Sequence, residues 1–187
     1  CLRECANGDL CEINYTSGTT GFSKGVMLRF NSLAANVSFA ISRIPLAPKD
    51  KVVSILPLAH AYGCAFEFLW PFAIGCHIHF LTRNPSPKVI LQAFADVNPK
   101  LLLMVPLILE KVYKKQILPK LKKFPVNMMI HTPGVRNIVY KKVLKQLMDS
   151  FGGEFLEVVI GGAAMNVEVE NFLRAIKFPY TVGYGMT

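Results

Sequence analysis

The chain has 187 residues, of which 52% are hydrophobic and 18% are charged, and its formal net charge is +9. This length and composition agree with one folded domain that has a sizeable core. The five cysteines follow no metal-ligand spacing, and their odd number without a signal peptide favours a reducing, cytoplasmic location. The mean hydropathy of +0.36 is high for a complete soluble domain. We therefore expect some apolar faces to pack against further parts of a longer protein.

The first predicted elements flank a segment rich in glycine and hydroxyl groups. Residues 10–15 read as a strand and residues 25–28 as the next short strand. Between them the chain reads Tyr-Thr-Ser-Gly-Thr-Thr-Gly-Phe-Ser-Lys-Gly, from Tyr15 to Gly25. Glycines let backbone N–H groups approach an anion, the hydroxyls add neutral donors, and Lys24 adds a mobile positive charge. The segment is therefore predicted to bind a polyphosphate.

A Walker phosphate loop is the first alternative for this segment. Its spacing is a glycine, four residues, then Gly-Lys-Ser/Thr. Counted from Gly18, the spacing fails twice, because Ser23 replaces the second glycine and Gly25 replaces Ser or Thr. A phosphate-loop NTPase with a divergent loop would also need an acidic residue at the end of a later apolar strand, which no predicted strand supplies. A Gly/Thr-rich surface turn is the other alternative.

The longest apolar stretch runs from Ala61 to Leu81. Glu67, Pro71 and Gly75 interrupt it, so a membrane-spanning helix is not expected. A helix over residues 59–73 and a strand over residues 76–81 fit the pattern better. His60 follows the predicted strand at residues 52–56, and a lone histidine there is more often structural than functional.

Strands and helices alternate over the rest of the chain. Further strands are predicted at residues 101–105, 156–160 and 180–183, and further helices at 32–44, 87–96, 107–118, 137–150 and 167–176. Continuous apolar strands between helices indicate a parallel sheet covered on both faces. The predicted fold class is therefore α/β, a mostly parallel sheet flanked by helices. Glycine-rich turns after such strands place ligands at the carboxyl edge of the sheet.

The positive charge is concentrated in one segment. Residues 111–145 hold ten lysines and arginines and no acidic residue, within a basic helical segment over residues 111–150. Two helices are predicted there, joined by an irregular loop that contains Met128, Met129 and Ile130. The segment is either a solvated face or a contact with an anionic membrane surface. Binding of CoA phosphate is a further alternative, and no RNP-type or zinc motif supports nucleic acid.

Two further glycine motifs follow predicted strands. Residues 159–164 read Val-Ile-Gly-Gly-Ala-Ala, and residues 182–187 read Val-Gly-Tyr-Gly-Met-Thr. Each alone fits an ordinary turn or a half-buried aromatic. Together with the motif at residues 15–28, and in this order, they resemble the adenylate-forming (AMP-binding) superfamily, which includes acyl-CoA synthetases, luciferases and adenylation domains. Val105-Pro106, followed by Leu-Glu-Lys-Val-Tyr at residues 109–113, is typical of the long-chain fatty acid–CoA ligases.

One departure from the family pattern is Ser23, which stands where these proteins usually have proline before the lysine. Loss of the fixed proline φ would loosen the loop without removing a ligand group.

The resemblance implies a role for particular residues. Thr16 with magnesium would bridge phosphates of ATP, and Lys24 would supply positive charge. Tyr184 would stack on adenine, Thr187 would meet the α-phosphate, and His60 would lie near the carboxylate and the acyl tunnel. The implied catalytic residues are Thr16, Lys24 and Thr187. The implied nucleotide-binding residues are Thr16, Ser17, Gly18, Thr19, Thr20, Gly21, Lys24, Gly161, Gly162, Ala163, Tyr184, Gly185, Met186 and Thr187.

The implied function is ATP-dependent activation of a fatty acid to an acyl-adenylate and then to acyl-CoA, with ATP, magnesium and CoA. Residues 1–187 would be part of the N-terminal domain of the acyl-CoA synthetase/luciferase-like fold, truncated at both ends. Cys1 is not an initiator methionine, and Thr187 is followed in the family by an acidic residue that helps hold magnesium. The isolated chain, without the family's C-terminal domain, is expected to be inactive. A non-enzymatic membrane-surface module is the remaining alternative.

Overall fold

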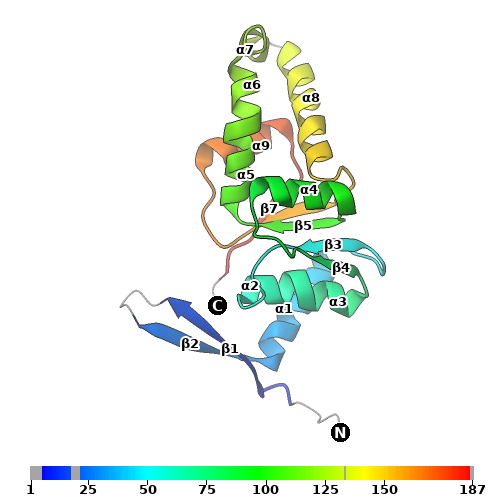
Figure 1. Ribbon diagram of the computed structural model, residues 1–187, viewed down its shortest axis with the longest axis vertical. Helices are drawn as coiled ribbons and strands as arrows, with labels where there is room; N and C mark the ends of the chain where they lie inside the picture. Colours follow the sequence, from blue (N-terminus) through cyan, green and yellow to red (C-terminus); the bar gives the residue numbers. More distant parts are fainter. Residues whose placement is uncertain (1–5, 18–21, 133, 186–187) are drawn as a thin grey trace.

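The computed structural model describes residues 6–17, 22–132 and 134–185, and its centre is a five-stranded sheet (Figure 1). Neighbouring strands are parallel throughout, in the order β4-β3-β5-β6-β7. The strands are β3 Lys51–Ser54, β4 His77–Phe80, β5 Leu101–Met104, β6 Glu157–Ile160 and β7 Tyr180–Val182. The parallel sheet confirms the predicted fold class, and each strand overlaps its predicted range.

Helices cover both faces of this sheet (Figure 1). They are α1 Phe30–Arg43, α2 Ala61–Gly63, α3 Trp70–Ile74, α4 Pro87–Val97, α5 Pro106–Val112, α6 Leu118–Lys122, α7 Val126–His131, α8 Val135–Ser150 and α9 Val167–Ile176. Two π-helical segments continue helices, η1 Cys64–Leu69 and η2 Tyr113–Ile117. None of the helices within the described ranges combines the length and apolar character needed to span a bilayer.

Alternate residues of the inner strands β3, β5 and β6 belong to different cores. On β5, Leu101 and Leu103 pack with Trp70 of α3, whereas Leu102 and Met104 pack in the larger cluster with α4, α5, α8 and α9. These strand residues are at most 1% exposed. Since side chains alternate across a strand, burial of both sets produces the continuous apolar runs visible in the sequence.

The glycine-rich motif lies outside this sheet. Strands β1 Leu10–Ser17 and β2 Ser23–Arg29 pair antiparallel and form a sheet of their own. In Figure 1 this hairpin extends away from the parallel sheet, next to the start of α1. Its exposed side chains include Tyr15, Phe22 and Met27.

Two predictions about helices need correction. Met128, Met129 and Ile130 belong to α7 and not to an irregular loop. Pro125 is the N-cap residue of this helix, and its carbonyl accepts the helical hydrogen bond from the Met129 N–H. The helix predicted over residues 59–73 begins at Ala61, ends at Ile74 and contains the π-helical segment η1, in which the buried Glu67 bonds Ser54 and Ile55 at the end of β3.

Candidate functional site

The β1–β2 hairpin brings the two residues expected to handle phosphate together. Thr16 and Lys24 are partners in the strand register, so they lie opposite each other on neighbouring strands. Lys24 is exposed. The sequence predicted both residues in a loop. The strands instead continue to the pair Ser17–Ser23, and Tyr15 and Thr16 are residue types that favour a strand. Gly18, Thr19, Thr20 and Gly21 lie outside the described residues.

The chain after the phosphate motif forms a strand. A Walker loop leads from a strand directly into a helix whose N-terminus meets the phosphates. Residues 23–29 instead form β2, paired with β1. This topology argues against the alternative of a phosphate-loop NTPase.

Asn14 links the hairpin to the segment between β3 and α2, residues 55–60, which we call the β3–α2 segment. Asn14 is 4% exposed. In the amide orientation that its partners require, its Nδ2 donates to the Ala59 carbonyl at 2.9 Å and its Oδ1 accepts from the Ala61 N–H at 3.1 Å. One side chain therefore ties the phosphate hairpin to the start of α2.

His60 lies at the end of the β3–α2 segment, directly before α2, and its side chain is exposed. Because β3 is parallel to its neighbours, this segment lies at the same carboxyl edge as the turns after β6 and β7. The position suits contact with a substrate and is compatible with the role that the sequence suggested.

Glu67 holds the other end of the β3–α2 segment, and sequence analysis gave it no functional role. Its carboxylate is fully buried, and Oε2 accepts hydrogen bonds from Ser54 Oγ at 3.0 Å, Ile55 N at 2.9 Å and Leu56 N at 2.8 Å. Burial raises the pKa of Glu67 to about 7, although the three hydrogen bonds oppose this rise. The signal in the sequence was an acidic residue inside an otherwise apolar run.

Tyr62 joins α2 to the second glycine motif. Its hydroxyl donates to the Val159 carbonyl at 3.1 Å. A Cβ added to Gly161 would stand 3.0 Å from Cζ of the Tyr62 ring, so a larger residue there would push this ring away by a few tenths of an ångström. Burial, followed by the charge of Glu67, raises the pKa of the Tyr62 phenol, which stays protonated as a donor.

The second and third motifs follow adjacent strands at one edge of the sheet. Ile160 of β6 pairs with Val182 of β7, and the Gly183 N–H donates to the Ile160 carbonyl at 2.8 Å. The turn Gly161–Ala163 and the segment Gly183–Gly185 therefore begin side by side. The Tyr184 ring is 93% exposed, which leaves its face open for stacking. Met186 and Thr187 lie outside the described residues.

The hydroxyl oxygen of Thr16 on the hairpin suits a metal ion that binds together with its substrate. In the part of the chain that the structure describes, no cluster of three or more His, Cys, Asp or Glu side chains comes together. Mg²⁺ takes oxygen ligands and is commonly bound by few protein groups together with substrate phosphates. The Thr16 hydroxyl, opposite Lys24, fits a magnesium–polyphosphate better than it fits a resident metal.

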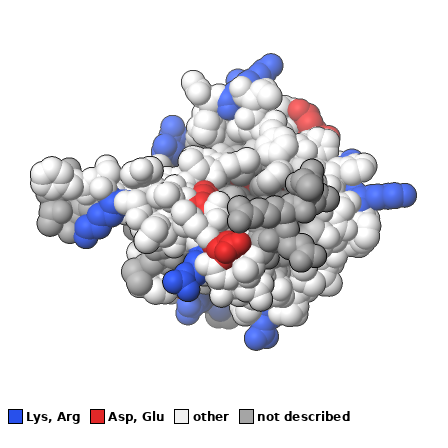
Figure 2. Space-filling view, turned by 90° about the horizontal axis from the view of Figure 1, so that it is seen from below, with Lys and Arg blue, Asp and Glu red and all other residues white. Residues whose placement is uncertain are grey.

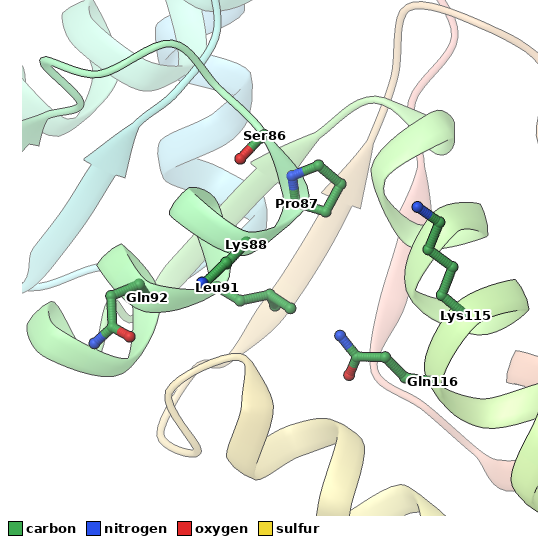
Figure 3. A pocket seen from close by; sticks show the side chains of 7 residues that line it. All are labelled: Ser86, Pro87, Lys88, Leu91, Gln92, Lys115 and Gln116. Atoms are coloured by element: carbon green, nitrogen blue, oxygen red, sulfur yellow. The ribbon is translucent and has the colours of Figure 1, made fainter.

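A pocket of about 480 Å³ lies elsewhere, between α4 and η2 (Figure 3). It is lined by Ser86, Pro87, Lys88, Leu91, Gln92, Lys115 and Gln116. This lining contains no residue of the three motifs. The candidate site is therefore an open edge of the sheet together with the hairpin, and not this pocket.

In α/β proteins with an open parallel sheet, ligands bind at the carboxyl edge of the strands, where the two glycine motifs of this chain lie. The sequence model of the AMP-binding enzyme family matches residues 2–187, and the chain belongs to this family.

Curated relatives and a solved structure agree with that assignment. The chain is 29% identical, over 96% of its length, to long-chain-fatty-acid–CoA ligase 1 of Saccharomyces cerevisiae. It is 30% identical, over 100% of its length, to long chain acyl-CoA synthetase 3 of Arabidopsis thaliana. It spans only 28% and 31% of these two proteins. The A-PCP didomain of a carboxylic acid reductase from Segniliparus rugosus, solved in complex with AMP, shares the fold, with TM-score 0.73 and 22% identity, covering 100% of this chain and 25% of that one.

Proposed function

We propose that the protein carrying this chain activates a fatty acid with ATP, first to an acyl-adenylate and then to acyl-CoA. The observation that carries the proposal is the arrangement of the three motifs. Thr16 and Lys24 pair on one hairpin, and Tyr62 and Asn14 connect that hairpin with the β3–α2 segment and the glycine turn after β6. The two long-chain relatives support the fatty acid as substrate class.

The reaction needs two displacements. A carboxylate oxygen of the acid attacks the α-phosphorus of ATP, and the bond to pyrophosphate breaks. The CoA thiol then attacks the acyl carbon, loses its proton, and AMP leaves with the electrons of the broken C–O bond. Lys24 would offset the charge that develops on pyrophosphate, and magnesium held partly by Thr16 would supply further positive charge. Tyr184 would hold adenine by stacking, His60 would lie near the acid, and Thr187 would meet the α-phosphate.

Exchange of pyrophosphate into ATP, dependent on added fatty acid, tests this function in the protein at its full length. We expect Lys24→Ala to lower the exchange rate about 10²-fold, the scale for removing one preorganised charge. Lys88→Ala, an exposed lysine of α4, is the matched control and should change little. Tyr184→Ala should raise the KM for ATP, while Tyr184→Phe, which keeps the ring, should not. Wild-type exchange in Lys24→Ala would overturn the assignment of the hairpin.

We also propose a cytoplasmic location with peripheral contact to an anionic membrane through residues 111–145. These residues belong to the helical part formed by α5 to α8, and α6, α7 and part of α8 project beyond the sheet in Figure 1. The opposite end of the molecule, seen from below in Figure 2, is mostly uncharged and carries separate Lys and Arg side chains together with some Asp and Glu side chains. Phe124 is 81% exposed and Ile138 66% exposed within the basic segment. Basic groups around exposed apolar side chains suit an anionic lipid surface.

Vesicle binding tests this contact. Replacing Lys120, Lys122 and Lys123 together with glutamine should weaken binding to anionic vesicles by about 1 kcal/mol per lysine, more at low salt than at high salt. The matched control replaces Lys51, Arg83 and Lys88 with glutamine, which removes the same charge outside the segment. Equal losses in both variants would indicate a general effect of net charge, and equal binding to neutral vesicles would contradict the proposal.

A further inference from the structure

The β3–α2 segment joins the hairpin, through Asn14, to helix α2, whose Tyr62 contacts the glycine turn after β6. One buried side chain holds the beginning of this segment. We propose that Glu67 is a positioning residue, which fixes the β3–α2 segment, and with it His60, relative to the phosphate hairpin and the glycine turn. This inference rests on the proposed function for its kinetic consequence, because the segment would align the acid with the α-phosphate.

The hydrogen bonds of Glu67 are directed at the point where β3 ends. The last residue of β3 is Ser54, and the following N–H groups of Ile55 and Leu56 have left the strand ladder. Oε2 accepts from both N–H groups and from the Ser54 hydroxyl, at 2.8 to 3.0 Å. Three donors on one oxygen fix the direction in which the chain leaves the sheet.

The helix that carries Glu67 is shaped to bring it there. Glu67 lies in η1, a π-helical segment between α2 and α3, and such segments change the direction of side chains within a helix. Gly63 allows the helix to approach the segment closely, since a Cβ at this position would stand 2.6 Å from the Pro57 carbonyl oxygen. The helix backbone at Gly63 and the Glu67 carboxylate therefore both contact the β3–α2 segment, within residues 55–57.

The segment passes this constraint to two other motifs. Asn14 of the hairpin bonds the Ala59 carbonyl and the Ala61 N–H. One residue further, Tyr62 donates to the Val159 carbonyl and packs against Gly161. A displacement of the β3–α2 segment would therefore move His60 relative to both the phosphate and the adenine ends of the site.

Stability alone does not account for an acidic residue at this position. The second carboxylate oxygen, Oε1, is buried and has no hydrogen-bond partner among the described residues. A buried unpaired polar atom is unfavourable, and an apolar side chain of similar size usually packs at lower cost. The three hydrogen bonds that Oε2 accepts offset part of this cost, and an apolar side chain could not accept them.

The test compares Glu67→Gln with Glu67→Met in the full-length protein. Glutamine keeps an oxygen that can accept from Ser54, Ile55 and Leu56, whereas methionine keeps the shape and removes the acceptor. We expect Glu67→Met to lower kcat/KM for the fatty acid in pyrophosphate exchange about 10²-fold, the scale for small misplacements of a reacting group. Glu67→Gln should lower the same kcat/KM by less than about 3-fold, because its side-chain oxygen stays in place. The KM for ATP should change less than kcat/KM for the fatty acid, because Lys24 and Tyr184 belong to parts of the chain that the Glu67 carboxylate does not contact.

Hydrogen exchange gives a readout that does not depend on the reaction. Amides of the β3–α2 segment should exchange faster in Glu67→Met than in Glu67→Gln, with the amides of β5 unchanged in both. Ser54→Ala removes one donor and should produce the same changes to a smaller degree, which covers the case in which Glu67→Met does not fold. The inference would be overturned if folded Glu67→Met kept the wild-type rates of amide hydrogen exchange and the wild-type kcat/KM for the fatty acid. If the wild type showed no pyrophosphate exchange but the amide hydrogens of Glu67→Met exchanged faster, the proposed function would be refuted and the positioning role would stand.

Discussion

The carboxyl group of Glu67 is protonated up to a higher pH in the folded chain than in the unfolded one. Its folded pKa is about 7, against an ordinary value of 4.5, because burial disfavours the charge. Between these two values the folded state binds more protons than the unfolded state. The contribution of this group to stability is therefore complete below pH 4.5 and is lost as the pH rises through 7.

This difference predicts a pH-dependent stability that one substitution removes. The free energy of unfolding of the wild type should fall by up to about 3 kcal/mol more than that of Glu67→Gln between pH 4.5 and pH 8. Urea unfolding of both variants at several pH values measures the difference, and comparison of the two cancels the other titrating groups. A difference that is constant over this range would show that Glu67 has an ordinary pKa in the folded chain.

The sequence proposes residues for direct contact with a ligand more readily than residues that would position them. Lys24 and Tyr184 stand in motifs whose glycines and hydroxyls indicate a phosphate and a ring-binding site, and the structure leaves both side chains exposed. Asn14 and Glu67 act on residues distant in the sequence, at positions 59 to 61 and 54 to 56. No local pattern shows such a contact, so only the folded chain identifies them.

At the scale of elements, α2 depends on a glycine at its C-terminal residue. Gly63→Ala would place a Cβ 2.6 Å from the Pro57 carbonyl oxygen, a backbone atom that cannot move without the β3–α2 segment. We expect a loss of about 1–3 kcal/mol in the free energy of unfolding, the range for overpacking. Chemical denaturation measures this loss.

Gly8→Ala is the matched control for that substitution. A Cβ at Gly8 meets nothing within 4 Å, so its stability should stay near that of the wild type. If Gly63→Ala were as stable as Gly8→Ala, the close contact between α2 and the β3–α2 segment would contribute little to the free energy of unfolding.

The alternation of apolar residues explains why the elements of the sheet were predicted and the π-helical segments were not. Strands such as β5 are buried on both faces, so their sequences are continuous apolar runs bounded by turn residues. The segments η1 and η2 differ from an α-helix by their hydrogen-bond spacing, which leaves the apolar period almost unchanged. The apolar pattern of the sequence therefore does not distinguish them from an α-helix.

At the scale of the whole molecule, the chain represents about 30% of the length of its curated relatives. We expect the 187 residues alone to form no acyl-CoA from fatty acid, ATP and CoA, because the relatives build one transition state from a much longer chain. A thioester assay with the purified 187-residue chain, beside the full-length protein, checks this. Measurable ATP- and CoA-dependent thioester formation by the short chain would contradict the expectation.

The separation of the hairpin from the parallel sheet also bears on the order of folding. The β1–β2 hairpin joins neighbouring stretches of chain, and such hairpins form in about 1–10 μs. The sheet instead pairs β3 with β5 and β5 with β6 across whole helices, which closes long loops and slows folding. The hairpin can therefore pair before the carboxyl edge of the sheet is complete. Because a two-stranded hairpin alone is only marginally stable in water, its lasting order depends on contacts with the rest of the chain, such as those of Asn14 with Ala59 and Ala61.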